Sequence, residues 1–160
     1  MQGLQLSTLA SSDDHRAHPG QRRYGLAAVA ATGLTRTEIL DSLYQRRTYG
    51  TTGSKILLKF SIDGQQMGSQ IKVRNNPSLS IEAHGTAEIE TVELLRYSKS
   101  DGMFKILQKL YPGTEDFSWN GVDERFTEDS IYYVRLRQVG LVRNHVAMAW
   151  SSPIWAMREQ

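Results

Sequence analysis

From residue 55 onward, hydrophobic residues recur with a period of two, the pattern of β-strands that bury one face. Ile56, Leu58, Phe60 and Ile62 share one face, and Asp63-Gly64 then predicts a turn. Further strands are predicted over residues 70–73, 79–84, 89–97, 104–110, 131–139, 145–150 and 154–157. Short strands with frequent turns indicate a mainly β fold, an antiparallel β-sandwich of the immunoglobulin-like (Ig-like) type.

Two local signals refine this prediction. Asp101-Gly102 predicts a hairpin between two of the strands. Tyr133 has the spacing of a tyrosine corner, in which a tyrosine hydroxyl holds the end of a strand.

The first 53 residues follow a different pattern. Leu4–Ala10 is a short apolar run that predicts a buried strand, and Gly25–Ala31 predicts a second one. The polar stretch between them, residues 11–20, predicts a loop because it ends in Pro19-Gly20. A strand, a loop, a strand and a helix cannot bury both faces of a layer, so this part either packs on the sandwich or belongs to a larger α/β body.

Thr35–Arg47 is the one predicted helix. Thr35 and Glu38 have the spacing of a capping box, and Leu40 and Leu43 lie on one apolar face. Arg46-Arg47 is expected in the last turn, where the helix dipole favours cations.

Composition and charge exclude several classes of protein. The 19 basic and 17 acidic residues show no basic stripe interleaved with aromatics, so we expect no nucleic-acid partner. No apolar run reaches the roughly 20 residues that span a bilayer, so we expect no membrane partner. The 160 residues contain no cysteine, which excludes disulfides and thiolate metal sites. The sequence does not indicate a compartment.

The candidate chemistry lies in the loop of residues 11–20. Asp13 and His15 follow the first predicted strand, and an Asp-x-His pair at a strand end offers an oxygen and a nitrogen ligand to Zn, Mn or Fe. Arg16 is a candidate for binding an anionic oxygen, and His18 is a candidate ligand or substrate contact. Composition alone favours the alternative, that Asp13-Asp14 is a turn and both histidines are solvated.

Other catalytic signatures are missing from the sequence. It contains no G-x-S-x-G nucleophile elbow and no glycine-rich phosphate loop. His84 and His145 fall inside predicted strands, where we expect structural roles.

The motifs resemble the C-terminal part of a metal-dependent hydrolase of the PHP superfamily, in the DUF3604 or CehA/McbA-like branch. The resemblance rests on Ser12-Asp13-Asp14-His15, on the apolar run from Gly25, on the segment from Arg46 to Gly53, and on the closing residues 149–156. It implies that residues 1–53 are the C-terminal remnant of an α/β (PHP) barrel and that residues 54–160 are an accessory β-sandwich domain. It also implies that the loop Thr48–Gly53 approaches the pocket.

The same resemblance implies an activity. Members hydrolyse phosphoesters or related anionic esters with two or three divalent metal ions. Asp13 and His15 would be metal ligands, with Arg16 and His18 as the catalytic residues that steady the leaving oxygen or an anionic group. The family's opening His-x-His does not occur in the 160 residues.

We therefore expect a fragment that binds metal poorly and has little activity alone, and that pairs with an upstream barrel portion or self-associates. The alternative is an Ig-like binding module that recognises a protein or a glycan.

Overall fold

A computed structural model of the chain describes residues 4–18 and 24–159. One helix and eleven strands are present in this part, so the predicted mainly β fold is confirmed. Their bounds are β1 Leu26–Val29, α1 Arg36–Tyr44, β2 Thr48–Thr51, β3 Leu57–Ile62, β4 Gln65–Gln66, β5 Gln70–Val73, β6 Ser78–Ser98, β7 Phe104–Leu110, β8 Thr114–Val122, β9 Ser130–Val142, β10 His145–Ser151 and β11 Ile154–Arg158.

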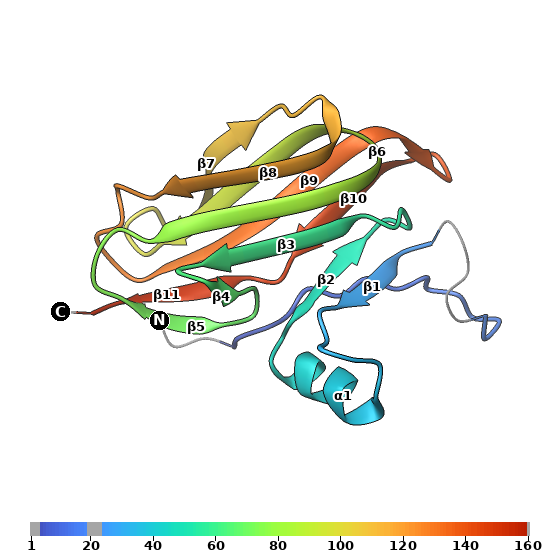
Figure 1. Cartoon of the computed structure of the whole chain (residues 1–160), viewed down its shortest axis with the longest axis horizontal. Helices are drawn as coiled ribbons and strands as arrows, with labels where there is room; N and C mark the ends of the chain where they lie inside the picture. The colour runs from blue at the N-terminus through green and yellow to red at the C-terminus, as the bar shows by residue number, and fades with distance from the viewer. Residues whose placement is uncertain (1–3, 19–23, 160) are drawn as a thin grey trace.

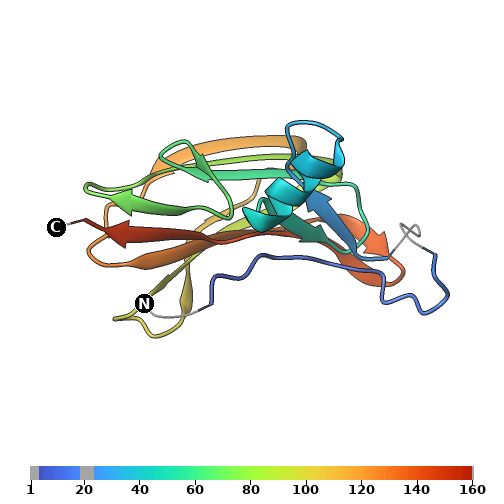
Figure 2. The same cartoon turned by 90° about the horizontal axis from the view of Figure 1, so that it is seen from below.

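The strands form one continuous sheet that curls over itself (Figure 1). Its main path runs β1-β2-β10-β9-β6-β3-β4, and every pairing is antiparallel except that of β5 with β11. Seen at right angles, β3, β6 and β8 lie over β9 and β11, with α1 beside β1 and β2 (Figure 2). The two layers are therefore halves of a single hydrogen-bonded sheet.

The 21-residue strand β6 joins the two layers. Its first half pairs with β3 and β8, and its second half pairs with β7 and β9. The ladder is irregular between His84 and Ile89, where the side chain of Gln138 accepts a hydrogen bond from Thr86 N at 3.1 Å and donates one to Thr86 Oγ1 at 2.9 Å. A bulge bends a strand, so this break lets β6 pass from one layer to the other.

The core lies between the layers and follows the predicted period of two. Ile56, Leu58, Phe60 and Ile62 are all buried, as are alternate residues at the start of β6 and along residues 130–138 of β9. At about 25 cal/mol per Å² of apolar surface, this burial is the main force that holds the layers together.

The predicted capping box is confirmed. Glu38 N donates to Thr35 Oγ1 at 3.3 Å, and Thr35 N donates to the Glu38 carboxylate at 3.2 Å. The Thr35 hydroxyl also donates to the Glu38 carboxylate, and this bond, followed by the one from Thr35 N, holds the pKa of Glu38 below its ordinary value. The helix ends at Tyr44, however, and Arg46 has a φ of 59°, so the placement of Arg46-Arg47 in the last turn is wrong. Arg46 instead donates from Nε to Gly68 O at 3.0 Å, in a neighbouring turn.

The strand predictions are confirmed where apolar and polar residues alternate clearly. β5 and β7 have the predicted bounds, while the two strands predicted over 79–84 and 89–97 are parts of β6. β8 was missed because it is polar and paired only to β6. The strand predicted over Leu4–Ala10 is wrong, because residues 4–14 form no ladder. No helix in the described ranges is long and apolar enough to span a bilayer.

Candidate functional site

Residues 4–12 lie against the curled sheet and lead into the candidate loop. Thr8 N donates to Ser152 Oγ at 2.9 Å, and Thr8 Oγ1 donates to Ser151 O at 3.0 Å. The buried Thr48 donates from Oγ1 to Thr8 O at 2.9 Å. Both edges of β2 are already paired, by β1 and by β10, so the segment binds through side chains instead of joining the ladder.

Two glycines let the segment approach the sheet closely. A Cβ atom at Gly50 would lie 2.9 Å from the Cβ of Ala10, and a Cβ atom at Gly25 would overlap the carbonyl oxygen of Ser11. Only a residue without a side chain fits at these two positions. The two glycines therefore determine how closely the segment before the loop packs on the sheet.

Asp14 shapes the loop itself. Its carboxylate accepts hydrogen bonds from Arg16 N at 3.1 Å and from His18 N at 3.2 Å, and Asp14 N donates to Ser12 Oγ at 3.3 Å. The Asp14 side chain is 10% exposed. Aspartate commonly organises turns in this way.

The loop brings Asp13 and His15 together. Asp13 Oδ1 lies 3.6 Å from His15 Nε2, and the two side chains are 93% and 90% exposed. A carboxylate oxygen and an imidazole nitrogen suit a divalent transition metal, but a catalytic zinc site normally takes three protein ligands. Across residues 4–18 and 24–159, no group of three His, Cys, Asp or Glu side chains could hold a metal ion. The pair therefore fits a metal in its chemistry and not in its number of ligands.

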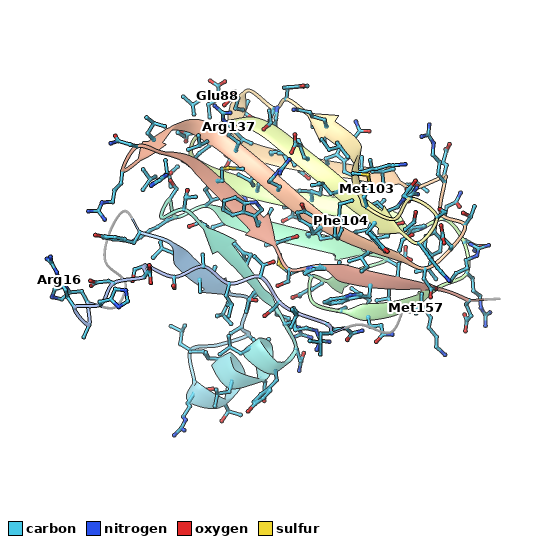
Figure 3. The ribbon with its side chains drawn as sticks, turned by 180° about the vertical axis from the view of Figure 1, so that it is seen from behind. Arg16, Glu88, Met103, Phe104, Arg137 and Met157 are labelled. Carbon is cyan, nitrogen blue, oxygen red and sulfur yellow. The ribbon has the colours of Figure 1, made fainter. Side chains whose placement is uncertain are left out.

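Arg16 and His18 occupy different surroundings. Arg16 lies at the outer tip of the loop, far from Met103 and Met157 (Figure 3), and lines a cavity with Asp13 and His15. His18 turns back to Asp14, with Nδ1 3.3 Å from Oδ2. Arg16 is thus placed beside the Asp13/His15 pair, while His18 supports the turn.

Two residues of this cavity were missed from the sequence. Tyr24 and Arg143 complete the lining, and the Arg143 guanidinium lies 3.9 Å from the centre of the Tyr24 ring. Arg143 is 130 residues from Asp13, so no local pattern connects them. Thr51 and Thr52 line an adjoining cavity that shares Tyr24 and Arg143. The segment Thr48–Gly53 is therefore not the predicted loop, because it begins with strand β2, and its residues Thr51 and Thr52 lie at this adjoining cavity.

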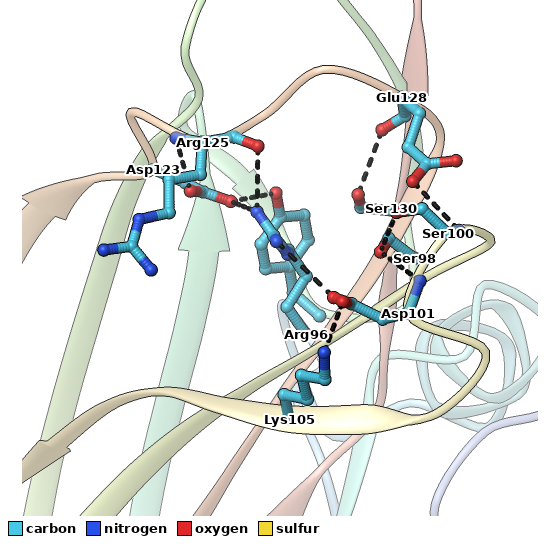
Figure 4. Close-up of polar contacts among 10 residues, drawn as sticks. Arg96, Ser98, Ser100, Asp101, Lys105, Asp123, Arg125, Glu128 and Ser130 are labelled. Carbon is cyan, nitrogen blue, oxygen red and sulfur yellow. Dashed lines mark hydrogen bonds and ion pairs between the residues drawn. The ribbon is translucent and has the colours of Figure 1, made fainter.

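A second polar cluster holds the other end of the sheet together (Figure 4). The buried Asp123 accepts hydrogen bonds from Arg96 Nη1 at 2.8 Å and from the hydroxyl of Tyr132 at 2.7 Å. Burial and the bond to Asp123 raise the pKa of Tyr132 far above its ordinary value. Tyr132, and not Tyr133, thus uses its hydroxyl to hold the end of a strand. The cluster is structural, because Asp123, Arg96 and Tyr132 are hydrogen-bonded to one another.

The remaining histidines differ from each other. His84 Nδ1 lies 2.7 Å from Asp116 Oδ1 on the outer face of β6 and β8. His145 is exposed at the start of β10 and lines the adjoining cavity.

Comparison with known proteins places the chain in a group whose function is not described. The family model "Protein of unknown function (DUF3604)" matches residues 6–88, which include the loop and the first half of β6. An uncharacterized protein of Chlamydia muridarum is 32% identical over 93% of this chain, and one of Chlamydia trachomatis is 32% identical over 89%. One of Chlamydia pneumoniae is 30% identical over 82%. The chain spans about a quarter of the length of these relatives, 24%, 24% and 22%.

Proposed function

This chain belongs to the DUF3604 family, and from that premise we propose that it forms part of a larger metal-dependent hydrolase of the phosphoesterase type. One observation carries the proposal: Asp13 and His15 converge to 3.6 Å on an exposed loop whose shape Asp14 sets. In this proposal, residues 1–53 are the end of a PHP-like barrel and residues 54–160 are its accessory domain.

The proposal gives each loop residue a task. Asp13 and His15 each present one donor atom to a shared metal ion, and Asp14 holds them in place. A bound metal would lower the pKa of a water molecule and polarise an ester. Arg16 binds an anionic oxygen of the substrate, because a guanidinium can donate two parallel hydrogen bonds to it. His18 contributes indirectly, through its contact with Asp14.

The remaining metal ligands come, in this proposal, from polypeptide outside these 160 residues. The relatives are about four times as long as the chain, which leaves room for a barrel. Exposed apolar side chains also support a missing neighbour: Leu4 is 87% exposed, Leu34 is 95% and Tyr44 is 81%. Such apolar surface commonly marks an interface. Alone, the chain would bind metal weakly and hydrolyse little.

Metal titration tests the proposal. We expect Mn²⁺ or Zn²⁺ at millimolar concentration to raise the melting temperature, because a ligand that binds only the folded state stabilises it. His15→Ala and Asp13→Asn should each remove this shift. His84→Ala is the matched control, since His84 is also an exposed histidine paired with an aspartate.

A metal-induced shift that survives in His15→Ala would contradict the proposal and leave the binding module as the better description. Light scattering provides a second test. Self-association of the isolated chain, reduced by Leu34→Ser, is expected if the exposed apolar surface belongs against a barrel. A monomer at high concentration would contradict that part of the proposal.

A further inference from the structure

We propose that the β9–β10 hairpin supplies an anion-binding subsite beside the Asp13/His15 loop, with Arg143 as the residue that binds a phosphate group. The ligand is a small organic phosphate whose aromatic or apolar part packs on Trp150. The choice of a phosphate ester rests on the proposed hydrolase function. The position of the subsite rests on the geometry of the hairpin.

The hairpin holds Arg143 in an unusual backbone conformation. Val142 pairs with His145, so Arg143 and Asn144 are the two loop residues, with φ values of 51° and 67°. Two positive φ values in a two-residue loop are typical of a type I′ turn, in which asparagine and glycine are favoured. An arginine at the first position is strained there, and strained residues concentrate at functional sites.

Residues other than glycine with positive φ are concentrated in the candidate loop and the β9–β10 hairpin. Six residues other than glycine have positive φ in the described ranges, and four of them lie in the candidate loop or the hairpin: Asp13, Ala17, Arg143 and Asn144. Both segments reach the same end of the molecule (Figures 1 and 2). The hairpin tip therefore belongs to the surroundings of the loop.

Arg143 joins two cavities. One contains Asp13, His15 and Arg16, and the other contains His145, Trp150 and the Thr51-Thr52 segment. Tyr24 and Arg143 line both, and we refer to the two adjoining cavities together as the cleft. Its lining therefore includes a cation, Arg143, shared by the two cavities, and a tryptophan, Trp150, in one of them.

The orientation of Arg143 suits an anion. Its guanidinium carbon lies 3.9 Å from the centre of the Tyr24 ring. An arginine that packs its flat face on an aromatic ring keeps its N–H edges free for hydrogen bonds. None of the ion pairs found among residues 4–18 and 24–159 involves Arg143. A planar guanidinium with open edges can bind a phosphate through two hydrogen bonds.

The walls of the cleft are held in place. Thr52 Oγ1 donates to Val146 O at 3.0 Å and accepts from Met148 N at 2.9 Å, which ties the Thr51-Thr52 segment to β10. Trp150 pairs with Gly50, the residue on which Ala10 rests. The cleft is therefore formed by residues from both the 1–53 and the 54–160 parts of the chain.

Binding of phenyl phosphate to the full chain tests the inference without metal. With EDTA present, we expect phenyl phosphate to change the tryptophan fluorescence and to shift the amide resonances of Arg143 and His145. Arg143→Asn keeps a residue that favours the turn and removes the charge. We expect it to weaken phenyl phosphate binding by about tenfold or more, because charge-assisted hydrogen bonds are lost.

Two controls separate charge at this site from charge in general. Arg74→Asn removes an exposed arginine that pairs with Glu159 elsewhere on the molecule, and it should leave the affinity for phenyl phosphate unchanged. Trp150→Phe should abolish the fluorescence change while the amide shifts persist. Equal affinity of the wild type and Arg143→Asn, with both folded by circular dichroism, would overturn the inference. Equal affinity for phenyl phosphate and inorganic phosphate would overturn the role of Trp150.

The two proposals fail separately. Arg143→Asn should keep the metal-induced thermal shift that His15→Ala removes, whereas His15→Ala should still bind phenyl phosphate. Phenyl phosphate binding without any metal shift would refute the hydrolase proposal and support the subsite. A metal shift without phenyl phosphate binding would refute the subsite alone.

Discussion

Asp123 and Asp14 each organise a loop with a largely buried carboxylate, but the side chains beside them differ in exposure. Asp123 is 2% exposed and binds Arg96, Tyr132 and the backbone N–H of Arg125. Asp14 binds the backbone N–H groups of its own loop, and the neighbouring Asp13 and His15 project into solvent. In the first region the buried carboxylate is paired with a cation and a hydroxyl of the protein, whereas in the second a pair of donor atoms is left exposed.

This difference shows that burial decides whether a carboxylate stabilises the fold or is free to bind a ligand. A buried carboxylate needs partners, because an unpaired charge in the interior is costly. An exposed carboxylate has no such need and is available to a ligand. The Asp123 cluster is therefore expected to govern stability, and the Asp13–His18 loop to govern binding.

Asp123→Ala is expected to have the largest effect. It leaves the Arg96 guanidinium and the Tyr132 hydroxyl without their buried acceptor. Breaking a buried pair costs about 3–5 kcal/mol, which urea unfolding at pH 7 would measure. Asp123→Asn, which keeps an acceptor oxygen, should lose less. A loss below about 1 kcal/mol for Asp123→Ala would remove the basis for calling the cluster structural.

Gly25→Ala tests how the loop is seated. The new Cβ would overlap the carbonyl oxygen of Ser11, so the segment must move away from β1. Overpacking of this kind costs about 1–3 kcal/mol. Hydrogen exchange of the Thr8 amide, which donates to Ser152, should become faster. Unchanged exchange at Thr8 would show that the glycine does not position the loop.

Glu93 provides a test by pH. Burial by itself raises the pKa of this carboxyl, but Arg135 and Lys109 outweigh it, so the pKa of Glu93 is lowered on folding. The unfolded chain then takes up the proton first as the pH falls. The stabilisation is complete above about pH 4.5 and is lost as the pH falls through the folded pKa.

Glu93→Gln should therefore cost about 1–2 kcal/mol at pH 7 and flatten the acid limb of the stability curve. The curves of the variant and the wild type should converge at low pH. Denaturant unfolding at several pH values provides the comparison, and parallel curves at all pH values would contradict it.

Asp14→Ala is expected to have the smallest effect on stability and the clearest effect on the site. Loss of loop hydrogen bonds near the surface should change the free energy of unfolding by about 0.5 kcal/mol or less. Amide exchange of Arg16 and His18 should nevertheless rise, and the metal-induced thermal shift should fall. If Asp14→Ala destabilised the protein as much as Asp123→Ala, the contrast between the two regions would not hold.

The candidate site could be predicted from the sequence only in part. Asp13, His15 and Arg16 were found because they follow one another within four residues, and the structure brings them to one cavity. Tyr24 and Arg143 were missed because they reach that cavity through folding of the β9–β10 hairpin. The placement of Thr8 on a face of the sheet was also missed, since an apolar run does not reveal which strand edges are already paired.

The sequence alone determined the local features of this protein. A period of two specifies which face of β3 is buried, and Thr35 with Glu38 specifies where the helix begins, because both depend on residues within a few positions of one another. The tertiary structure decided that β6 serves both layers, that Tyr132 and Asp123 meet, and that Arg143 reaches the loop of Asp13. These contacts join residues far apart in the chain, and only the packing of the whole sheet determines which of them form.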